Sequence, residues 1–311
     1  MILIITEKAD QSTNNVINWL SHFKLKWFRI NEDDDLDYLF SGTDITIKKG
    51  KQSFDLSEIK AVWYRRGHLR FKFHPINDEY INNSLKSEYI KIHEFIYYKL
   101  SLLPHINTFK GSDVNKLIVS DIARKLNIKT PDDYLFSEKI RLSILEPHLE
   151  YSTKSITGSN VLHYEGFFAV DYTVKLEGNY YIPTTFFPSL IQNYIVKKYE
   201  LRIFYLQGEF WSMAIFSQKD NTTATDFRNY NRQKPNRNVS FDIPKYLKIQ
   251  LRELMTELNL NCGSIDMIVT PENEFYFLEV NPIGQFGMVD IPCNYGLNKE
   301  IASYFKKYYY D

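Results

Sequence analysis

FYFLEVNPIGQFG, residues 275–287, ends an apolar alternating run with a glutamate, an asparagine and a proline. Side chains two residues apart on a strand point to the same face of a sheet. Glu279 and Asn281 are therefore predicted to share a face with Phe277. Buried carboxylates are costly unless they bind a metal or pair with a base, so this strand end indicates a functional site. Exposed polar residues at a strand end are the alternative.

The preceding stretch, GSIDMIVTPENEF at residues 263–275, predicts a second strand and a turn around residues 271–273. If Thr270 pairs with Phe275, the register sets Asp266 opposite Glu279. Facing side chains lie roughly 5 Å apart, and like charges there repel. We therefore expect a cation between them. Oxygen ligands without histidine or cysteine suit Mg²⁺, which usually takes one or two carboxylates together with substrate phosphates.

The composition is that of an ordinary globular protein: 311 residues, 44% hydrophobic and 24% charged. Lysine plus arginine equals aspartate plus glutamate at 38 each, so no net field attracts nucleic acid or anionic lipid. Two cysteines predict neither a disulfide framework nor a metal-binding CxxC pair. The N-terminus lacks a signal-peptide pattern, and no apolar run approaches the roughly 18 residues of a membrane span. A cytoplasmic protein without nucleic-acid or membrane partners is expected.

Hydrophobic periodicity predicts three parts: an N-terminal α/β domain at residues 1–103, a central domain at 104–188 and a C-terminal domain at 189–311. Strands are expected at 2–5 and around 26–30, and helices at 13–23, 78–100 and 114–126. The acidic NEDDDLD segment, residues 31–37, is predicted to be a solvated loop. A hairpin at 200–216 precedes a long polar loop at 217–242, and a helix is expected to start at Pro244. Alternating strands and helices predict α/β or α+β.

A nucleotide site is suggested by basic and small residues, although GxxxxGK[ST] and GxGxxG motifs are absent. In YSTKSITGSN, residues 151–160, Lys154 precedes small residues around Gly158 whose backbone N–H groups suit phosphate. A solvated lysine is the alternative. Glu200 and Arg202 share one strand face in ELRIFYL, where a surface ion pair is the alternative. Asp226 and Arg228 lie in the long polar loop, and loops of such length tend to be functional or disordered.

Taken in order, these motifs resemble an ATP-grasp ligase over residues 104–300. FLEVNPIGQFG, together with VWYRR at 62–66 and the N-terminal ILIITEKADQSTNNVINWL, is similar to the ATP-grasp peptide maturases of graspetide pathways. That family comprises the microviridin-type ligases and the related grasp-with-spasm maturases. The resemblance implies an α+β ATP-grasp fold, in which the central and C-terminal domains sandwich ATP beside an N-terminal α/β domain.

The resemblance also implies roles for individual residues. Nucleotide contacts fall to Lys116 and Lys154 near the phosphates, to the adenine linker and to the ribose-binding Glu200; the linker matches Gln192, Tyr194 and Ile195. The magnesium ligands match Asp266, Glu279 and Asn281, and Asn281 also counts among the nucleotide contacts. Arg202 matches a cation near the γ-phosphate or acyl phosphate, Arg228 a contact to the transferring group, and Asp226 a candidate base. Arg65 and Arg66 have either a structural role or a role in acceptor binding.

In the graspetide interpretation, ATP and Mg²⁺ activate Asp or Glu side chains of a ribosomal precursor peptide as acyl phosphates. Ser or Thr hydroxyls or Lys amines of the same peptide then attack, closing macrolactones or macrolactams. A homodimer and capture of the leader by the central domain are further implications. Two alternatives stay open: an ATP-grasp ligase that adds glutamate-like residues to a protein or cofactor, and a non-catalytic nucleotide-binding module.

Overall fold

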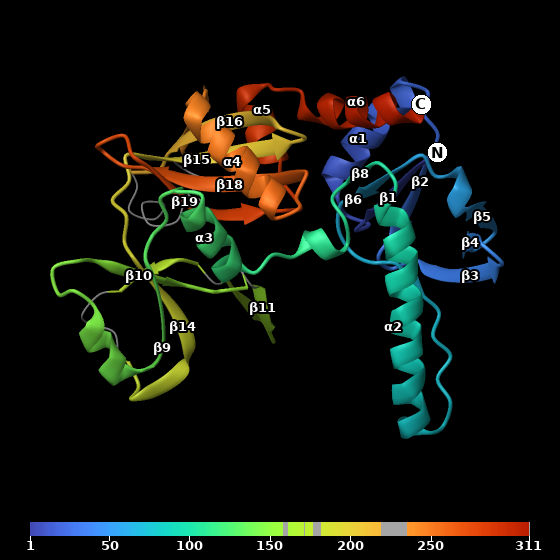
Figure 1. Cartoon of the computed structure of the whole chain (residues 1–311), viewed down its shortest axis with the longest axis horizontal. Helices are drawn as coiled ribbons and strands as arrows, with labels where there is room; N and C mark the ends of the chain where they lie inside the picture. Colours follow the sequence, from blue (N-terminus) through green and yellow to red (C-terminus); the bar gives the residue numbers. More distant parts are fainter. Residues whose placement is uncertain (158–160, 171, 177–181, 219–234, 311) are drawn as a thin grey trace. The chain divides into compact units, whose positions relative to one another are not determined.

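The computed structural model of the chain describes residues 1–157, 161–170, 172–176, 182–218 and 235–310. Its contacts divide the chain into two units, residues 1–113 with 295–311 and residues 114–294 (Figure 1). The boundary predicted at residue 188 lies within the second unit, and the division into three domains stays a prediction. None of the described helices is both long and apolar enough to cross a bilayer.

The first unit is built on a parallel sheet with the strand order β2-β1-β6-β8. Its strands are β1 (Ile2–Thr6), β2 (Trp27–Asn31), β6 (Ala61–Tyr64) and β8 (His105–Ile106). Helix α1 (Gln11–His22) connects β1 to β2, and α2 (Glu79–Ser101) precedes β8. β1 is buried along its whole length, as expected for a central parallel strand covered on both faces. These elements confirm the strands and helices predicted for residues 2–30 and 78–100.

A second sheet of this unit has the order β5-β4-β3-β7. It comprises β3 (Asp35–Ser41), β4 (Asp44–Lys49), β5 (Gln52–Asp55) and β7 (Arg70–Phe71), with a short 3₁₀ turn at Leu56–Glu58. The solvated loop predicted for the whole NEDDDLD segment is therefore wrong in its second half. β3 begins at Asp35, and Leu36 is completely buried in the core beneath this sheet. One buried leucine outweighs the charge around it because its neighbours on the strand point to the opposite face.

Arg65 joins the end of β6 to the start of α1. Its Nε donates to Asp10 Oδ2 at 2.9 Å, and both side chains are almost completely buried. Asp10 also caps α1 by accepting from the backbone N–H of Thr13 at 3.2 Å. Burial raises the pKa of the Asp10 carboxyl, but the Arg65 guanidinium and these hydrogen bonds outweigh it and bring the pKa below its usual value. Arg65 is thus a structural residue, whereas the Arg66 side chain is 28% exposed.

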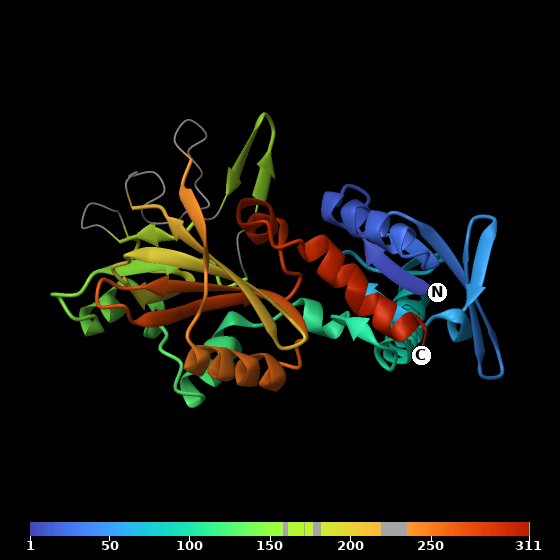
Figure 2. The same ribbon diagram turned by 90° about the horizontal axis from the view of Figure 1, so that it is seen from above.

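The last helix, α6 (Leu297–Tyr309), belongs to the first unit and packs beside α1 (Figure 2). The Lys306 ammonium lies 4.8 Å from the ring centroid of Phe23, the C-cap residue of α1. The Phe305 ring lies 6.2 Å from that of Trp63 on β6. The hydroxyl of Tyr309 accepts from the backbone N–H of Lys26 at 3.2 Å. The first unit is therefore assembled from the two ends of the described chain.

The second unit contains two larger sheets and a separate hairpin. A four-stranded antiparallel sheet has the order β13-β10-β14-β9, formed by β9 (Asp133–Glu138), β10 (Tyr151–Lys154), β13 (Val174–Lys175) and β14 (Thr185–Asn193). The hairpin pairs β11 (Val161–Tyr164) with β12 (Phe167–Val170). Short 3₁₀ helices occupy Lys110–Ser112, which belongs to the first unit, and Lys139–Ile144.

The five-stranded antiparallel sheet of this unit has the order β17-β16-β15-β18-β19. Its strands are β15 (Tyr199–Leu206), β16 (Glu209–Phe216), β17 (Arg237–Phe241), β18 (Cys262–Val269) and β19 (Phe275–Asn281). The predicted hairpin at 200–216 is confirmed as β15 and β16. The long polar loop predicted for 217–242 is wrong at its end, because β17 pairs with β16 from Arg237 to Phe241.

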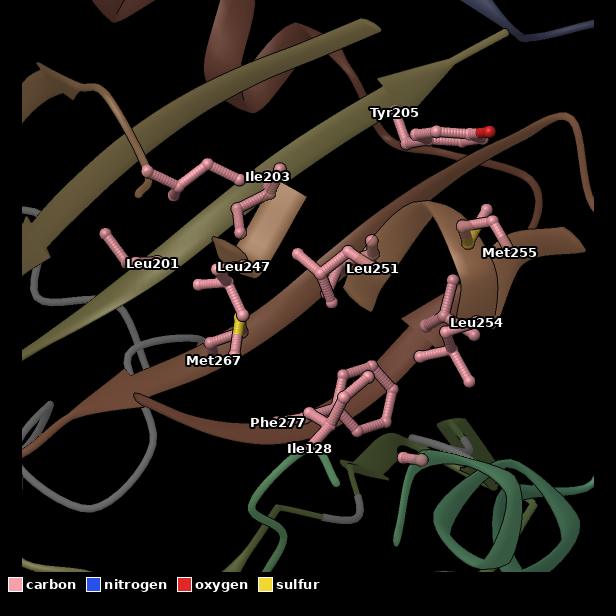
Figure 3. Close-up of a cluster of buried hydrophobic side chains, with 14 of the residues drawn as sticks. Ile128, Leu201, Ile203, Tyr205, Leu247, Leu251, Leu254, Met255, Met267 and Phe277 are labelled. Atoms are coloured by element: carbon pink, nitrogen blue, oxygen red, sulfur yellow. The ribbon is translucent and has the colours of Figure 1, made fainter. Parts of the chain in front are cut away.

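Two helices cover one face of this sheet, α3 (Lys116–Lys125) and α4 (Lys245–Glu257), as Figures 1 and 2 show. Leu247, Leu251 and Leu254 of α4, at helical spacing, pack into the core. Met267 and Phe277 of β18 and β19 meet them from the sheet (Figure 3). A short helix, α5 (Gly287–Cys293), follows β19. The opposite face of the sheet carries the charged side chains Arg202, Asp266 and Glu279, which are described below.

The hairpin of β18 and β19 reaches its predicted pairing by an unpredicted route. Val269 rather than Thr270 pairs with Phe275, so the expected register is wrong near the turn. Met267 then pairs with Phe277, whereas Asp266 pairs with Glu279, which leaves Leu278 as the extra residue of a β-bulge. The predicted opposition of Asp266 and Glu279 is confirmed because the bulge restores it.

The bulge also decides which side chains face the core. Phe277 and Val280 both lie in the helix-covered core, so Leu278 and Glu279 both turn to the opposite face. The expectation that Phe277 shares a face with Glu279 is therefore wrong, because it assumed unbroken alternation. Without the extra residue, a carboxylate at position 279 would point into a leucine-rich core.

Replacing residues on the two sides of the bulge tests this geometry. We expect Phe277→Ala to lower the free energy of unfolding by about 3–5 kcal/mol, since it empties a core position. Leu278→Ala, on the pocket face, is expected to cost about 1 kcal/mol or less. Urea denaturation of both variants gives the two values. The reverse ranking would mean that the strand alternates without a bulge.

Candidate functional site

A pocket lies between the two larger sheets of the second unit. Strands β10 and β14 supply one wall, β15, β18 and β19 supply the other, and the segment between β14 and β15 connects them. The charged and amide side chains along it are Lys154, Gln192, Asn193, Lys197, Glu200, Asp266 and Glu279. Of the residues predicted from the sequence, the structure thus brings Lys154, Gln192, Tyr194, Ile195, Glu200, Asp266 and Glu279 to one pocket.

A row of charges crosses the floor of this pocket. Arg202, Asp266 and Glu279 are register partners on three neighbouring strands, so their side chains lie side by side on one face. Arg202 Nη1 contacts Asp266 Oδ2 at 2.5 Å. Lys116, the first residue of α3, places Nζ 2.8 Å from Glu279 Oε2. Each carboxylate is thus paired with a cation at one end of the row, and the magnesium ion expected between the two carboxylates stays a prediction.

Lys116 and Lys154 approach the pocket from different elements. Lys116 Nζ also lies 3.5 Å from the carbonyl oxygen of Ser155, the residue after β10. Lys154 ends β10 and lines the pocket itself. Two ammonium groups near two carboxylates are suited to a ligand that carries both anionic groups and a bound cation. Gly158, in the predicted phosphate loop, lies outside the described residues.

Glu200 is held in a buried, hydrogen-bonded position. Lys197, three residues earlier, contacts Glu200 Oε1, and the hydroxyl of Ser217 donates to the same oxygen at 3.0 Å. Both side chains of the ion pair are less than a tenth exposed. Burial raises the pKa of the Glu200 carboxyl, and the Lys197 ammonium opposes that shift. Among the described residues, both recorded donors engage Oε1 of this pocket-lining carboxylate, and the contact of Glu200 with ribose hydroxyls stays a prediction.

The end of β14 and the segment that connects it to β15 carry the predicted adenine contacts. Gln192 Nε2 donates to Asp133 Oδ1 at 2.6 Å across the β9–β14 pair. The backbone N–H of Tyr194 donates to the carbonyl of Glu150 at 2.7 Å. The Tyr194 ring lies under the Lys175 ammonium, 4.9 Å from its centroid. Ile195 follows along the same wall, so the segment presents an apolar edge with a polar side chain at its start.

Four other predicted site residues are not among the described residues that line the pocket: Arg202, Asp226, Arg228 and Asn281. Arg202 is 3% exposed and lies beside Asp266, so its contact with a ligand stays a prediction. Asp226 and Arg228 lie outside the described residues. Asn281 ends β19 opposite Ser264 and is exposed, and it is not among the described residues that line the pocket. Its roles as nucleotide contact and magnesium ligand stay predictions.

The donor set of the floor fits magnesium. Among the residues that the structure describes, no cluster of three or more His, Cys, Asp and Glu side chains could hold a metal. Two carboxylates from adjacent strands, completed by substrate phosphates, are the arrangement that Mg²⁺ commonly adopts. Asp266 and Glu279 would hold the ion, and Lys116 and Arg202 would share their charge.

Three contributors escaped the sequence-based analysis: Lys197, Ser217 and Asp133. Lys197 stands beside Lys198 in VKKY, and nothing in the pair distinguishes the buried lysine from the exposed one. No local pattern identifies Asp133, whose partner Gln192 lies 59 residues away.

The first comparison concerns the N-terminus. Residues 1–112 match the family model of the MvdD pre-ATP grasp domain. Among curated proteins, no sequence matches this chain.

Solved structures resemble the whole chain. A RiPP-associated ATP-grasp ligase from Chryseobacterium gregarium, in complex with ADP and a leader and core peptide, is 22% identical with a TM-score of 0.79, covering 97% of this chain and 94% of that one. The macrocyclase MdnC from Microcystis aeruginosa, bound with its precursor peptide MdnA, is 26% identical with a TM-score of 0.76, covering 97% and 98%. The ATP-grasp ligase PsnB, complexed with a minimal precursor, Mg and ADP, is 12% identical with a TM-score of 0.74, covering 100% and 98%.

The chain has the ATP-grasp fold. The predicted fold class and the resemblance to ATP-grasp peptide maturases are confirmed by these structures and by the N-terminal family match. In this ATP-grasp chain, eight of the nine predicted nucleotide and metal residues border this pocket or pair with its carboxylates, and Asn281 is the exception.

The buried Lys197–Glu200 pair generates a stability prediction. Lys197→Met leaves an uncompensated buried carboxylate, so we expect the free energy of unfolding to fall by about 3 kcal/mol or more. The double variant Lys197→Met, Glu200→Gln removes both charges and is expected to recover most of the loss. Denaturation curves of the three proteins at pH 7 give these values.

The same variant, Lys197→Met, also predicts how the free energy of unfolding depends on pH. Without Lys197, the pKa of Glu200 in the folded state is expected to rise further above its unfolded value. The folded state then binds more protons than the unfolded state, so stability increases as the pH falls. The deficit of Lys197→Met is expected to be smaller at pH 5 than at pH 8. A deficit that does not change with pH would exclude an uncompensated Glu200 carboxylate as its cause.

Proposed function

We propose that this protein is an ADP-forming, ATP- and Mg²⁺-dependent ligase that closes macrolactone or macrolactam rings in a ribosomal precursor peptide. The observation that supports this most is the charge row Arg202–Asp266–Glu279–Lys116 on the floor of the pocket. Neighbouring structures of the same fold include ligases in complex with ADP, Mg and precursor peptides. The type of bond that closes each ring, ester or amide, is part of the proposal.

The reaction requires activation of a carboxylate. An Asp or Glu side chain of the peptide is a poor acyl donor, because its leaving group would be an oxide. Attack of one carboxylate oxygen on the γ-phosphorus of ATP forms an acyl phosphate and releases ADP. A hydroxyl or amine of the same peptide then attacks the acyl carbon, loses its proton, and expels phosphate. Both reactants lie on one chain, so positioning supplies much of the acceleration.

The residues of the pocket would divide this work. Lys154 and Lys116 neutralise phosphate charge, and Glu200 accepts from the ribose hydroxyls. Bound Mg²⁺ spreads the charge of the transferring phosphoryl group. Asp266 and Glu279 hold that ion, while Arg202 orients Asp266. Asp226 as candidate base and Arg228 as contact to the transferring group remain part of the proposal.

The competing ligase function is addition of separate amino acids to a protein or cofactor. D-alanyl-alanine synthetase A from Vibrio cholerae shares the fold with a lower TM-score of 0.57, so the peptide-directed ligases are the better supported model. A cytoplasmic location and a homodimer are carried by the family resemblance and form part of the same proposal. Sedimentation equilibrium of the purified chain measures the oligomeric state.

Removing one floor carboxylate tests the magnesium role. Glu279→Gln keeps the shape but removes a charged ligand, so we expect turnover to fall at least about a hundredfold, with little change in the circular dichroism spectrum. Glu274→Gln is the matched control: Glu274 precedes β19 and forms an exposed ion pair with Lys129, and its loss is expected to leave turnover unchanged. Product is measured by mass spectrometry of the precursor peptide. Near-normal activity of Glu279→Gln at ordinary Mg²⁺ concentration would refute a metal role for this carboxylate.

The chemical route is tested with heavy oxygen. If the side-chain carboxylates of the precursor are labelled with ¹⁸O, each ring closed is expected to transfer one labelled oxygen to phosphate, because the attacking oxygen departs with phosphorus. ATP is expected to give ADP in step with ring closure. Unlabelled phosphate beside genuine product would exclude an acyl phosphate. AMP formed in step with product would indicate adenylation instead.

A further inference from the structure

Gln192 has only one side-chain orientation that suits its surroundings. Its amide faces the Asp133 carboxylate on the paired strand, with Nε2 2.6 Å from Oδ1. A carboxylate only accepts hydrogen bonds, whereas an amide offers a donor at nitrogen and an acceptor at oxygen. Turning the amide over would place two oxygens against each other. Asp133 therefore fixes the nitrogen toward itself and the oxygen away from itself.

Asp133 is itself held in place from behind. Arg124, in the last turn of α3, contacts Asp133 Oδ2 through Nη2. Arg124 Nη2 also donates to the carbonyl of Pro131 at 3.0 Å. Arg124 Nε donates to Thr130 Oγ1 at 2.9 Å. The guanidinium thus ties the carboxylate to the loop that precedes β9. Charge-assisted hydrogen bonds of this kind are short and directional, so Asp133 has little freedom to release Gln192.

The free end of the amide is available to a ligand. Gln192 is 6% exposed and lines the nucleotide pocket. Within the described part of the chain, the hydrogen bond from Nε2 to Asp133 is the one that the structure records for this side chain. The amide oxygen is therefore an acceptor at the wall where the adenine linker begins.

An acceptor at this position discriminates between purines. Adenine carries an amino group at C6, which donates, whereas hypoxanthine and guanine carry an oxygen there, which accepts. The first would pair with the Gln192 oxygen, and the second would face it oxygen to oxygen in a buried place. A polar site rejects the mismatched partner strongly because buried groups are left unpaired.

We propose that Asp133, oriented by Arg124, is a positioning residue that sets adenine specificity by fixing the amide of Gln192. The inference rests on the proposed function, since it assumes that the pocket binds a purine nucleotide. It assigns to Asp133 and Arg124 a role in which neither touches the nucleotide. A purely structural role for Asp133 would weaken all nucleotides alike, so selectivity is the decisive quantity.

Binding of ADP and IDP, which differ in the substituent at C6 and in the hydrogen at N1, is measured by calorimetry with Mg²⁺ on the full chain. The wild type is expected to bind ADP at least about tenfold more tightly than IDP. In Asp133→Asn the new amide can donate, Gln192 can turn over, and its nitrogen then faces the pocket. We expect ADP to bind more weakly and IDP more tightly, so that the ratio approaches one or inverts.

Two further variants make the outcome interpretable. Asp132→Asn is the matched control, because the exposed neighbour contributes only its backbone N–H, to Asn193, and the ratio is expected to remain that of the wild type. Gln192→Met leaves Asp133 intact and removes the reading group, and its ratio is expected to fall to about one. A melting curve of each variant confirms folding.

Several results would overturn the inference. Equal affinity of the wild type for ADP and IDP would do so without any variant. Asp133→Asn that weakens both nucleotides and keeps the ratio would reduce Asp133 to a structural residue, while leaving the proposed function intact. A wild type that binds neither nucleotide would instead overturn the proposed function, and the specificity with it.

Discussion

A single extra residue in β19 determines where the chemistry of this protein can lie. Leu278 has no partner on β18, so the strand presents Phe277 to the helices and Glu279 to the pocket, although regular alternation would put both on one face. The core beneath the five-stranded sheet demands an apolar side chain at 277 and again at 280. A polar floor on the other face demands carboxylates at 266 and 279. Only an interruption of the pleat satisfies both demands.

A second regularity concerns two side chains that line the pocket. Glu200 and Gln192 are each held by the protein at one atom. Glu200 is held at Oε1 by Lys197 and Ser217, and Gln192 at Nε2 by Asp133. Such groups lose little rotational freedom when a ligand arrives, because the protein has already fixed them during folding. The orientation of these two side chains is then set by their hydrogen-bond partners Lys197, Ser217 and Asp133.

The sequence was sufficient for the elements with strong periodicity and for the residues at strand ends. Leu247, Leu251 and Leu254 located α4, and the Asp266–Glu279 opposition was predicted from two alternating strands and a turn. That prediction succeeded because two deviations cancelled: the turn is one residue longer than expected, on the β18 side, and the bulge adds one residue to β19. The acidic run before Leu36 and the strand from Arg237 were misread, because a single buried side chain or a distant partner strand outweighs local polarity.

The limits of the sequence-based analysis lie in long-range partners. Nothing near Lys116 shows that it will meet Glu279, 163 positions later by residue number, and nothing near Gln192 shows Asp133. Lys197 and Lys198 are chemically identical neighbours, yet the first is buried against Glu200 and the second reaches Asn273. Both lie in the segment between β14 and β15, where no strand alternation shows which side chain turns inward.

The return of α6 to the first unit has a consequence for how the chain acquires its structure. α6 leaves the ribosome after all of the second unit, and a ribosome that adds roughly 5–20 residues per second needs on the order of ten to forty seconds for that stretch. Throughout that time, Trp63 and the α1 surface around Phe23 lack the helix that covers them. The first unit is therefore the last to be completed, and the nascent protein carries an exposed aromatic surface on this unit while the pocket of the second unit is already folding.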